Sequence, residues 1–193
     1  DEWGTWYDQE PGSHPGFLYQ QNSLRDAEVA ALSLNIFQRH SDRVKGANIA
    51  QMINVLQAMI LTDKDKMVLT PTYHVFDMYQ AFMGATPYPA TVSGPDYVQG
   101  DSHLPMADVF AARGKDGKLV LSIVNTDPAH AVQVVTNLAG SAHGRILTAF
   151  AMDAHNTFDA PNLVHPLPFK SSTQDGKMSF DMPAKSVVVV TVD

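Results

Sequence analysis

The sequence predicts an α/β fold over residues 1–85 and an all-β fold over residues 86–193. Apolar residues recur at helical spacing in 24–40 and 71–84, and a long apolar run lies between these two segments. After Gly84 the pattern changes to short segments in which polar and apolar residues alternate, which is typical of β-strands. The chain is therefore predicted to join a βα-type segment to an antiparallel β-sandwich.

The first predicted helix spans residues 24–40. It follows Ser23, and Asp26 lies three residues later, which matches the Ser/Thr-x-x-acid pattern of a helix start. The two side chains can bond backbone N–H groups that have no partner in the first turn. The middle of the helix is apolar, which suits packing against a sheet: Val29, Leu32, Leu34, Ile36 and Phe37.

The remaining α/β segments follow in chain order. An aromatic entry precedes a loop rich in proline and glycine at 11–16. We interpret 44–50 as a buried strand with a short helical stretch after it, although periodicity alone does not separate strand from helix in an apolar run. Residues 62–66 are predicted as a polar turn, and a helix begins at Pro71 and ends near Gly84.

Six strands are predicted in the second part, at 107–113, 118–125, 130–137, 145–151, 177–182 and 186–192. Asp116-Gly117 separates two of them and is typical of a tight hairpin turn. The β-branched run Val187–Val190 predicts a central strand.

Composition restricts the possible functions. Of 193 residues, 45% are hydrophobic and 17% charged, which indicates a globular chain. The net charge is −7 and no basic stripe occurs, so neither nucleic acid nor a membrane is an expected partner. The chain has no cysteine and its eight histidines are scattered, so we expect no metal site and no cofactor.

The first seven residues, Asp-Glu-Trp-Gly-Thr-Trp-Tyr, carry the strongest chemical signal. Aromatic faces stack on sugar rings, and a carboxylate such as Glu2 can attack an anomeric carbon. From these residues alone the signal is weak, and a frayed chain terminus whose aromatic side chains pack on the core is the favoured interpretation.

Taken with further blocks in the chain, this heptad resembles the nucleophile motif of glycoside hydrolase family 51, the α-L-arabinofuranosidases. The blocks occur in the order of that family: Leu24–Ala27, Arg39–Val44, Ala47–Val55, Thr70–Tyr79 and, in the predicted sandwich, His155–Phe158. The resemblance implies a (β/α)8 TIM barrel followed by a jelly-roll-type antiparallel β-sandwich. Residues 1–85 would form the C-terminal segment of the catalytic barrel, strands 7 and 8 with their helices, and 86–193 the sandwich.

The resemblance also implies roles for individual residues. Glu2 matches the nucleophile, Trp6 matches an aromatic residue that lines the sugar pocket, and Gln51 matches a residue that hydrogen-bonds the arabinofuranosyl ring. We expect Gln51 to be a buried amide at a strand end, bonded by substrate hydroxyls or by backbone. Three further polar residues are interpreted as structural, although the last of them could also face the site: Asn48, Asn54 and His74.

A second carboxyl group is missing from this pattern. Retaining glycosidases use a nucleophile and an acid/base about 5–5.5 Å apart. In the family the acid/base glutamate follows an asparagine on the fourth barrel strand, which would lie upstream of Asp1. Glu10 in the proline/glycine loop and Glu28 in a helix do not fit the role. We therefore expect an N-terminal barrel segment, in a separate chain or outside this sequence, and no activity from this chain alone.

The predicted function is that of a retaining exo-α-L-arabinofuranosidase acting on arabinoxylan or arabinan, with this chain supplying the nucleophile. Two alternatives stay open: a non-catalytic carbohydrate-binding or oligomerisation module, and a relative active on β-glucans. The resemblance favours a homo-oligomer. The compartment is left open between the cytoplasm and export to the periplasm or medium.

Overall fold

The computed structural model describes residues 2–193, so Asp1 of the aromatic heptad lies outside the described residues. The chain forms two compact units. Unit 1 consists of Asp1–Asp77 and Ala149–His165, and unit 2 of Met78–Thr148 and Pro166–Asp193. The division into two domains at about residue 85 stays a prediction. In the structure the first stretch of unit 1 ends at Asp77, and unit 2 begins at Met78.

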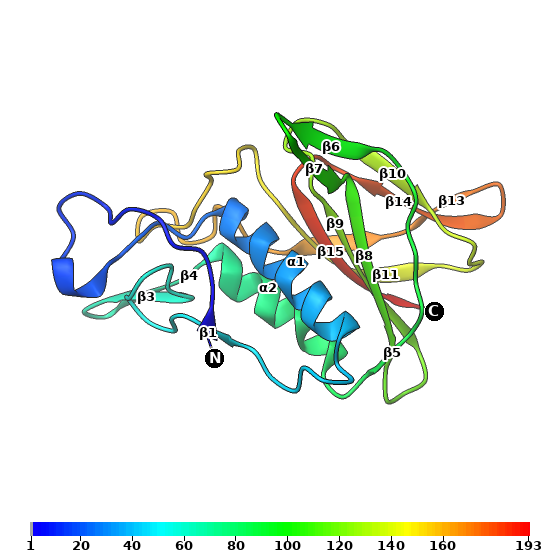
Figure 1. Cartoon of the computed structure of the whole chain (residues 1–193), viewed down its shortest axis with the longest axis horizontal. Coiled ribbons are helices and arrows are strands. Elements are labelled where there is room, and N and C mark those ends of the chain that lie inside the picture. Colours follow the sequence, from blue (N-terminus) through cyan, green and yellow to red (C-terminus); the bar gives the residue numbers. More distant parts are fainter. Residues whose placement is uncertain (1) are drawn as a thin grey trace. The chain divides into compact units, whose positions relative to one another are not determined.

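Unit 1 pairs short strands with two helices (Figure 1). Its elements are β1 (Glu2–Trp3), a 3₁₀ turn at Pro15–Phe17, α1 (Leu24–Arg39), β2 (Asn48–Ile49), β3 (Ile60–Asp63), β4 (Lys66–Leu69) and all but the last two residues of α2 (Pro71–Tyr79). β1 and β2 are parallel, whereas β3 and β4 form an antiparallel hairpin. Among the described residues no helix is long and apolar enough to cross a membrane.

Helix α1 begins where the sequence predicts. The backbone N–H and the hydroxyl of Ser23 both donate to Asp26 Oδ2, at 2.8 and 3.1 Å, which forms the expected cap. The helix buries its first residue, Leu24, and its alanines, with Ala27 and Ala31 fully buried. The large apolar residues of its middle are less covered than predicted, and Ile36 is 49% exposed.

The segment after β2 corrects a prediction. The short helix expected after 44–50 is absent from the described chain, and residues 51–59 form bends that lead into β3. Asn54 and Leu56 have positive φ values of 57° and 54°, which a right-handed helix does not accommodate. The Asn54 side chain exchanges hydrogen bonds with the backbone N–H and hydroxyl of Thr62, both 2.8 Å. A polar side chain that bonds nearby backbone in this way competes with helix formation. Asn54 therefore has the structural role that the sequence predicts.

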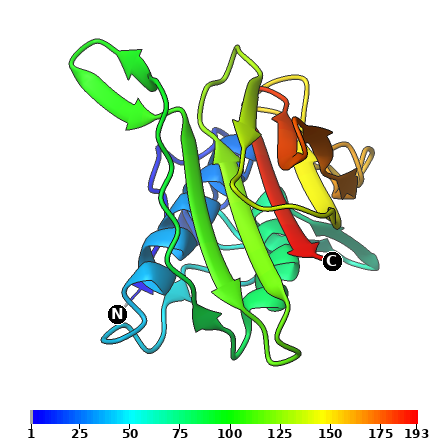
Figure 2. The ribbon, with the colours of Figure 1, turned by 90° about the vertical axis from the view of Figure 1, so that its right-hand side faces the viewer.

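Unit 2 is built from antiparallel sheets (Figure 2). After a 3₁₀ turn at Gln80–Phe82, its strands are β5 (Thr86–Pro87), β6 (Asp96–Gln99), β7 (Ser102–Pro105), β8 (Ala107–Arg113), β9 (Leu119–Asn125), β10 (Val132–Val135), β11 (Ala142–Thr148), β12 (Leu167–Lys170), β13 (Ser172–Gln174), β14 (Lys177–Met182) and β15 (Ser186–Val192). The large sheet has the order β12-β11-β15-β9-β8-β5, and a smaller one has the order β10-β14-β13. β6 and β7 form a separate hairpin.

The core of unit 2 lies between these two sheets. Met178 and Phe180 of the small sheet cluster with Ile123 and Val188 of the large one, and all four are at most 1% exposed. β15 lies between β11 and β9, and Val187–Val190 is buried, as a central strand requires. The predicted sandwich of antiparallel strands is therefore confirmed.

The predicted strands differ in accuracy. Those at 107–113, 177–182 and 186–192 coincide with β8, β14 and β15. The strand predicted at 145–151 corresponds to β11, which begins earlier, at Ala142, and ends at Thr148. It pairs with β15 over this whole length, from Ala142 opposite Val192 to Thr148 opposite Ser186. Sequence periodicity did not reveal the start of this strand, where His143-Gly144 interrupts the apolar pattern.

Residues 149–165 leave the sandwich and pack in unit 1, although we expected the block His155–Phe158 within the sandwich. The carbonyls of Ala154 and Met152 accept hydrogen bonds from the first backbone N–H groups of α1, those of Leu24 and Arg25, both at 2.9 Å. These groups have no partner inside the helix, so the returning segment completes the N-terminus of α1.

Candidate functional site

Glu2 lies on the face of β1 that is turned away from the helices. Side chains of neighbouring strand residues point to opposite faces. The ring of Trp3 packs edge-on against Phe37 of α1, with centroids 5.4 Å apart, and stacks on Phe76 of α2 at 6.3 Å. The contacts of Trp3 therefore show which side of β1 faces the helices, and Glu2 is exposed on the opposite side.

Gln51 follows β2, the parallel neighbour of β1. Glu2 pairs with Asn48 and Trp3 with Ile49, and the Ala50 N–H donates to the Trp3 carbonyl at 3.0 Å. The pairing brings the ends of the two strands together. Gln51 itself is exposed, which corrects the expectation of a buried amide: it lies in the open bend after β2, where its backbone carbonyl accepts from the Met59 N–H at 3.2 Å.

Trp6 is presented to solvent beside a shallow surface pocket. Its side chain is 67% exposed, whereas Trp3 is half-buried. The pocket has a volume of about 510 Å³ and is lined by Trp6, Tyr7, Asp8, Gln9 and Leu18. An exposed indole next to polar groups has the surface needed to stack on a sugar ring.

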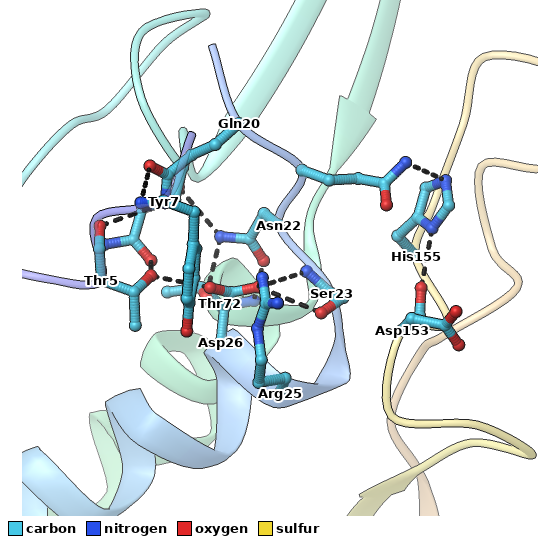
Figure 3. Close-up of polar contacts among 12 residues, drawn as sticks. Thr5, Tyr7, Gln20, Asn22, Ser23, Arg25, Asp26, Thr72, Asp153 and His155 are labelled. Carbon is cyan, nitrogen blue, oxygen red and sulfur yellow. Dashed lines mark hydrogen bonds and ion pairs between the residues drawn. The ribbon is translucent and has the colours of Figure 1, made fainter. Parts of the chain in front are cut away.

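A single buried amide holds the backbone on both sides of Trp6 (Figure 3). Gln20 is 1% exposed. Its Oε1 accepts a hydrogen bond from the Tyr7 N–H at 2.8 Å, and its Nε2 donates to the Thr5 carbonyl at 3.1 Å. Because one end of the amide accepts and the other donates, its orientation is fixed by its partners.

The Thr5 side chain connects the same segment to helix α1. Its hydroxyl lies 2.7 Å from Asp26 Oδ1 and 2.5 Å from the side-chain oxygen of Gln57. A hydroxyl has one proton and cannot donate to two acceptors, while the buried Gln57 Nε2 has no hydrogen-bond partner. A half-turn of the Gln57 amide places its NH2 group beside the Thr5 hydroxyl and leaves the Thr5 proton for Asp26. Hydrogen bonds are then donated from Gln57 to Thr5 and from Thr5 to the carboxylate of Asp26.

Further contacts hold the surroundings of this network in place. The Asn22 side chain donates to the Gln57 carbonyl and to the Thr72 hydroxyl, both at 2.9 Å, and accepts from the Thr72 N–H at 3.1 Å. The guanidinium of Arg25 lies 3.8 Å from the centre of the Tyr7 ring, a cation–π contact. The segment that carries Trp6 is thus bonded from several sides.

Sequence reasoning did not identify this support. Gln20 and Gln57 stand in loops with no local pattern, and Asp26 was recognised only as a helix cap. The other structural assignments hold in part, since His74 is buried and Asn48 is exposed on β2. Among residues 2–193 no group of three or more His, Asp or Glu side chains could hold a metal ion.

A larger cavity lies within unit 2 and does not carry comparable chemistry. It has a volume of about 670 Å³ and opens over the face of β8 and β9, with apolar walls that include Val109, Leu121, Ile123, Val132 and Val134. The one charged residue in its described lining is Asp96. A single carboxyl group does not provide the pair that glycoside hydrolysis requires.

The comparison with protein families covers nearly the whole chain. Residues 1–186 match the model of the α-L-arabinofuranosidase C-terminal domain. The chain belongs to this family. The resemblance found in the sequence is therefore confirmed.

Relatives extend this result. The chain is 47% identical over 196 residues to an intracellular exo-α-L-arabinofuranosidase of Bacteroides ovatus, covering 98% of this chain and 38% of that protein. The structure of a family 51 arabinofuranosidase from Xanthomonas axonopodis pv. citri matches with a TM-score of 0.94 and 46% identity, over all of this chain and 40% of that one. A Thermotoga maritima α-L-arabinofuranosidase in complex with arabinose matches with a TM-score of 0.82 and 26% identity, over all of this chain and 42% of that one. The chain thus spans about two fifths of the length of these family members.

Proposed function

We propose that this chain supplies the catalytic nucleophile, Glu2, of a retaining exo-α-L-arabinofuranosidase. The observation that carries the proposal is the position of Glu2, exposed on β1 opposite the helix-packed Trp3 and in the motif of an arabinofuranosidase family. In a (β/α)8 barrel the helices lie outside the strands, and active sites lie at the C-terminal ends of the strands. The parallel pair β1–β2 with α1 and α2 fits the end of such a barrel, and unit 2 fits a jelly-roll domain.

The reaction would proceed by double displacement. Glu2 attacks the anomeric carbon of a terminal arabinofuranosyl unit, while an acid donates a proton to the departing glycosidic oxygen. The resulting ester between Glu2 and the sugar is then cleaved by water, which the same acid, now a base, deprotonates. Two inversions give net retention.

The second carboxyl group is proposed to come from an N-terminal barrel segment. Neither other glutamate of the chain is placed for the role. Glu28 is buried in α1, and Glu10 sits in the loop where its N–H donates to the Tyr19 carbonyl at 2.8 Å. The complete enzyme is the protein in which this chain is joined by that segment, and activity is expected only from it.

Trp6 and Gln51 are the proposed substrate contacts. Exposed Trp6 would stack on the sugar, and Gln51 would bond its hydroxyls. The proposed substrates are arabinan and arabinoxylan, and a homo-oligomer remains the expected assembly. Product analysis on arabinan, arabinoxylan and β-glucan checks the substrate class: release of arabinose from the first two is expected, and glucose from the third would contradict it.

The nucleophile is tested by Glu2→Ala in the complete enzyme, assayed on an aryl α-L-arabinofuranoside. We expect kcat to fall at least about 10³-fold, because no covalent intermediate can form. Azide added to this variant should restore turnover and give a glycosyl azide of inverted configuration, since one displacement then replaces two. Glu10→Ala is the matched control and should keep near-normal activity. Near-normal turnover of Glu2→Ala would exclude Glu2 as the nucleophile.

A further inference from the structure

We propose that Gln20 is a positioning residue whose amide fixes the backbone on both sides of Trp6 and thereby holds the indole ring where the substrate meets it. The inference rests on the proposed function, in which Trp6 contacts the sugar. Gln20 does not touch the substrate in this proposal. It acts through Trp6.

The amide of Gln20 bonds both residues that flank Trp6. One planar group bonds the residue before Trp6 through Nε2 and the residue after it through Oε1, at 3.1 and 2.8 Å (Figure 3). Gln20 is held in turn, since its own N–H donates to the Leu56 carbonyl at 3.1 Å. A buried amide with both ends bonded leaves the Thr5–Tyr7 backbone little freedom to turn.

Within this chain the indole of Trp6 is 67% exposed, so the chain itself offers little side-chain packing to keep it in place. The two residues beside it are anchored instead, Thr5 to Asp26 at 2.7 Å and Tyr7 beneath Arg25 at 3.8 Å. Ordering a side chain on binding costs free energy, so a stacking surface fixed beforehand through its backbone binds more tightly.

The chemistry of an amide suits the position of Gln20. The site needs one acceptor for an N–H and one donor for a carbonyl within a single side chain. Glutamine offers both, whereas glutamate keeps only the acceptor and methionine keeps neither at similar size. These two replacements therefore separate the hydrogen bonds from the volume of the side chain.

The test is a double-mutant cycle in the complete enzyme, with Gln20→Met, Trp6→Ala and the pair of substitutions, each assayed for kcat/KM on an aryl α-L-arabinofuranoside. We expect Gln20→Met to lower kcat/KM about tenfold when Trp6 is present and less than about twofold when Trp6 is alanine. A residue that acts through Trp6 loses its effect once Trp6 is removed. A general loss of folding would lower activity equally in both backgrounds.

Gln21→Met is the matched control. Gln21 is the next residue, and its side chain bonds the His155 ring at 2.9 Å instead of the Trp6 segment. This variant should keep kcat/KM within about twofold of the parent enzyme. Thermal unfolding of every variant ensures that all assays are made on folded protein. Should Gln20→Met fail to fold, Gln20→Glu, which keeps the acceptor and loses the donor, takes its place in the cycle and is expected to show the same dependence on Trp6.

The outcomes separate the two proposals. An equal loss in both Trp6 backgrounds, or no loss with Trp6 present, overturns the role of Gln20 while leaving the arabinofuranosidase proposal intact. A parent enzyme that does not cleave the arabinofuranoside overturns the proposed function. Full activity of Trp6→Ala overturns Trp6 as a substrate contact, and the role of Gln20 with it.

Discussion

Thr5 and Asp26 lie 21 residues apart in the chain and are joined by a hydrogen bond of 2.7 Å from the Thr5 hydroxyl to the Asp26 carboxylate. The same carboxylate caps α1 through Ser23 and lies 3.2 Å from the Arg25 guanidinium. One buried side chain therefore both starts the helix and holds the segment between Glu2 and Trp6. Helix formation and the geometry of the candidate site depend on the same group.

Removal of this group should be costly. Asp26→Ala leaves the Ser23 N–H and the Thr5 hydroxyl without their acceptor in a buried place, and we expect it to lower the free energy of unfolding by about 2–3 kcal/mol. Denaturant titration of the complete enzyme measures this loss. Asp42→Ala, at an exposed position, is the control and should change stability by less than about 0.5 kcal/mol. Equal stability of the two variants would contradict the central role of Asp26.

Gly4 leaves no room for a side chain. A Cβ at this position would lie 2.1 Å from the end of the Gln57 side-chain amide, and the φ of Gly4, +154°, is one that other residues rarely adopt. We expect Gly4→Ala to destabilise the protein by about 2 kcal/mol, because its φ is strained for alanine and the buried Gln57 amide would have to shift out of its hydrogen bond with Thr5. Gly46→Ala, where a Cβ would meet nothing within 4 Å, should be nearly neutral. Differential scanning calorimetry compares them, and a Gly4→Ala melting temperature equal to that of Gly46→Ala would count against this packing.

How much of this arrangement the sequence could predict differs between its elements. α1 and the strands β8, β14 and β15 follow from local signals, namely a cap with helical spacing and alternating or β-branched runs. Glu2 and Trp6 are proposed as site residues because of a motif. β1 and β2 have two residues each, too few to show a period, and their pairing joins Glu2 to Asn48 across 46 positions of chain.

The residues that support the site could not be predicted from local sequence patterns, for a related reason. Gln20 contacts Thr5 and Tyr7 through side-chain to backbone bonds, and such contacts place no constraint on neighbouring residue types. The return of 149–165 to unit 1 is likewise a long-range event, carried by carbonyl groups that every residue possesses. Side-chain periodicity indicates which face of an element is buried, and it gives no information on these hydrogen bonds.

The returning segment provides a third prediction. Asn156 is 3% exposed and donates to the carbonyls of Leu69 and Val164, both at 2.8 Å, while it accepts from the Val164 N–H at 2.7 Å. Asn156→Ala would leave these groups unpaired, and we expect a loss of about 2–4 kcal/mol and faster proteolysis within 149–165. Limited digestion followed by mass spectrometry locates the cuts. Asn162→Ala, at an exposed position, should digest like the parent protein, and identical patterns for both variants would refute the role of Asn156.

The last prediction concerns the acid stability of unit 2. Burial of Asp127 tends to raise the pKa of its carboxyl group, but hydrogen bonds from the Ala129 N–H and from the ring and N–H of His130 outweigh it, so that the pKa lies below its ordinary value. The ionised carboxylate therefore stabilises the folded state above the unfolded pKa, and this contribution is lost as the pH falls through the folded pKa. We expect Asp127→Asn to lower the melting temperature by about 2–4 °C near pH 6. The difference should shrink as the pH falls below about 4 and vanish only below the lowered pKa of the folded state. Asp175→Asn, an exposed substitution with the same change in charge, controls for net charge. Melting curves between pH 2 and pH 6 decide the matter, because a difference that stays constant over this range would show that ionisation of Asp127 does not stabilise the fold.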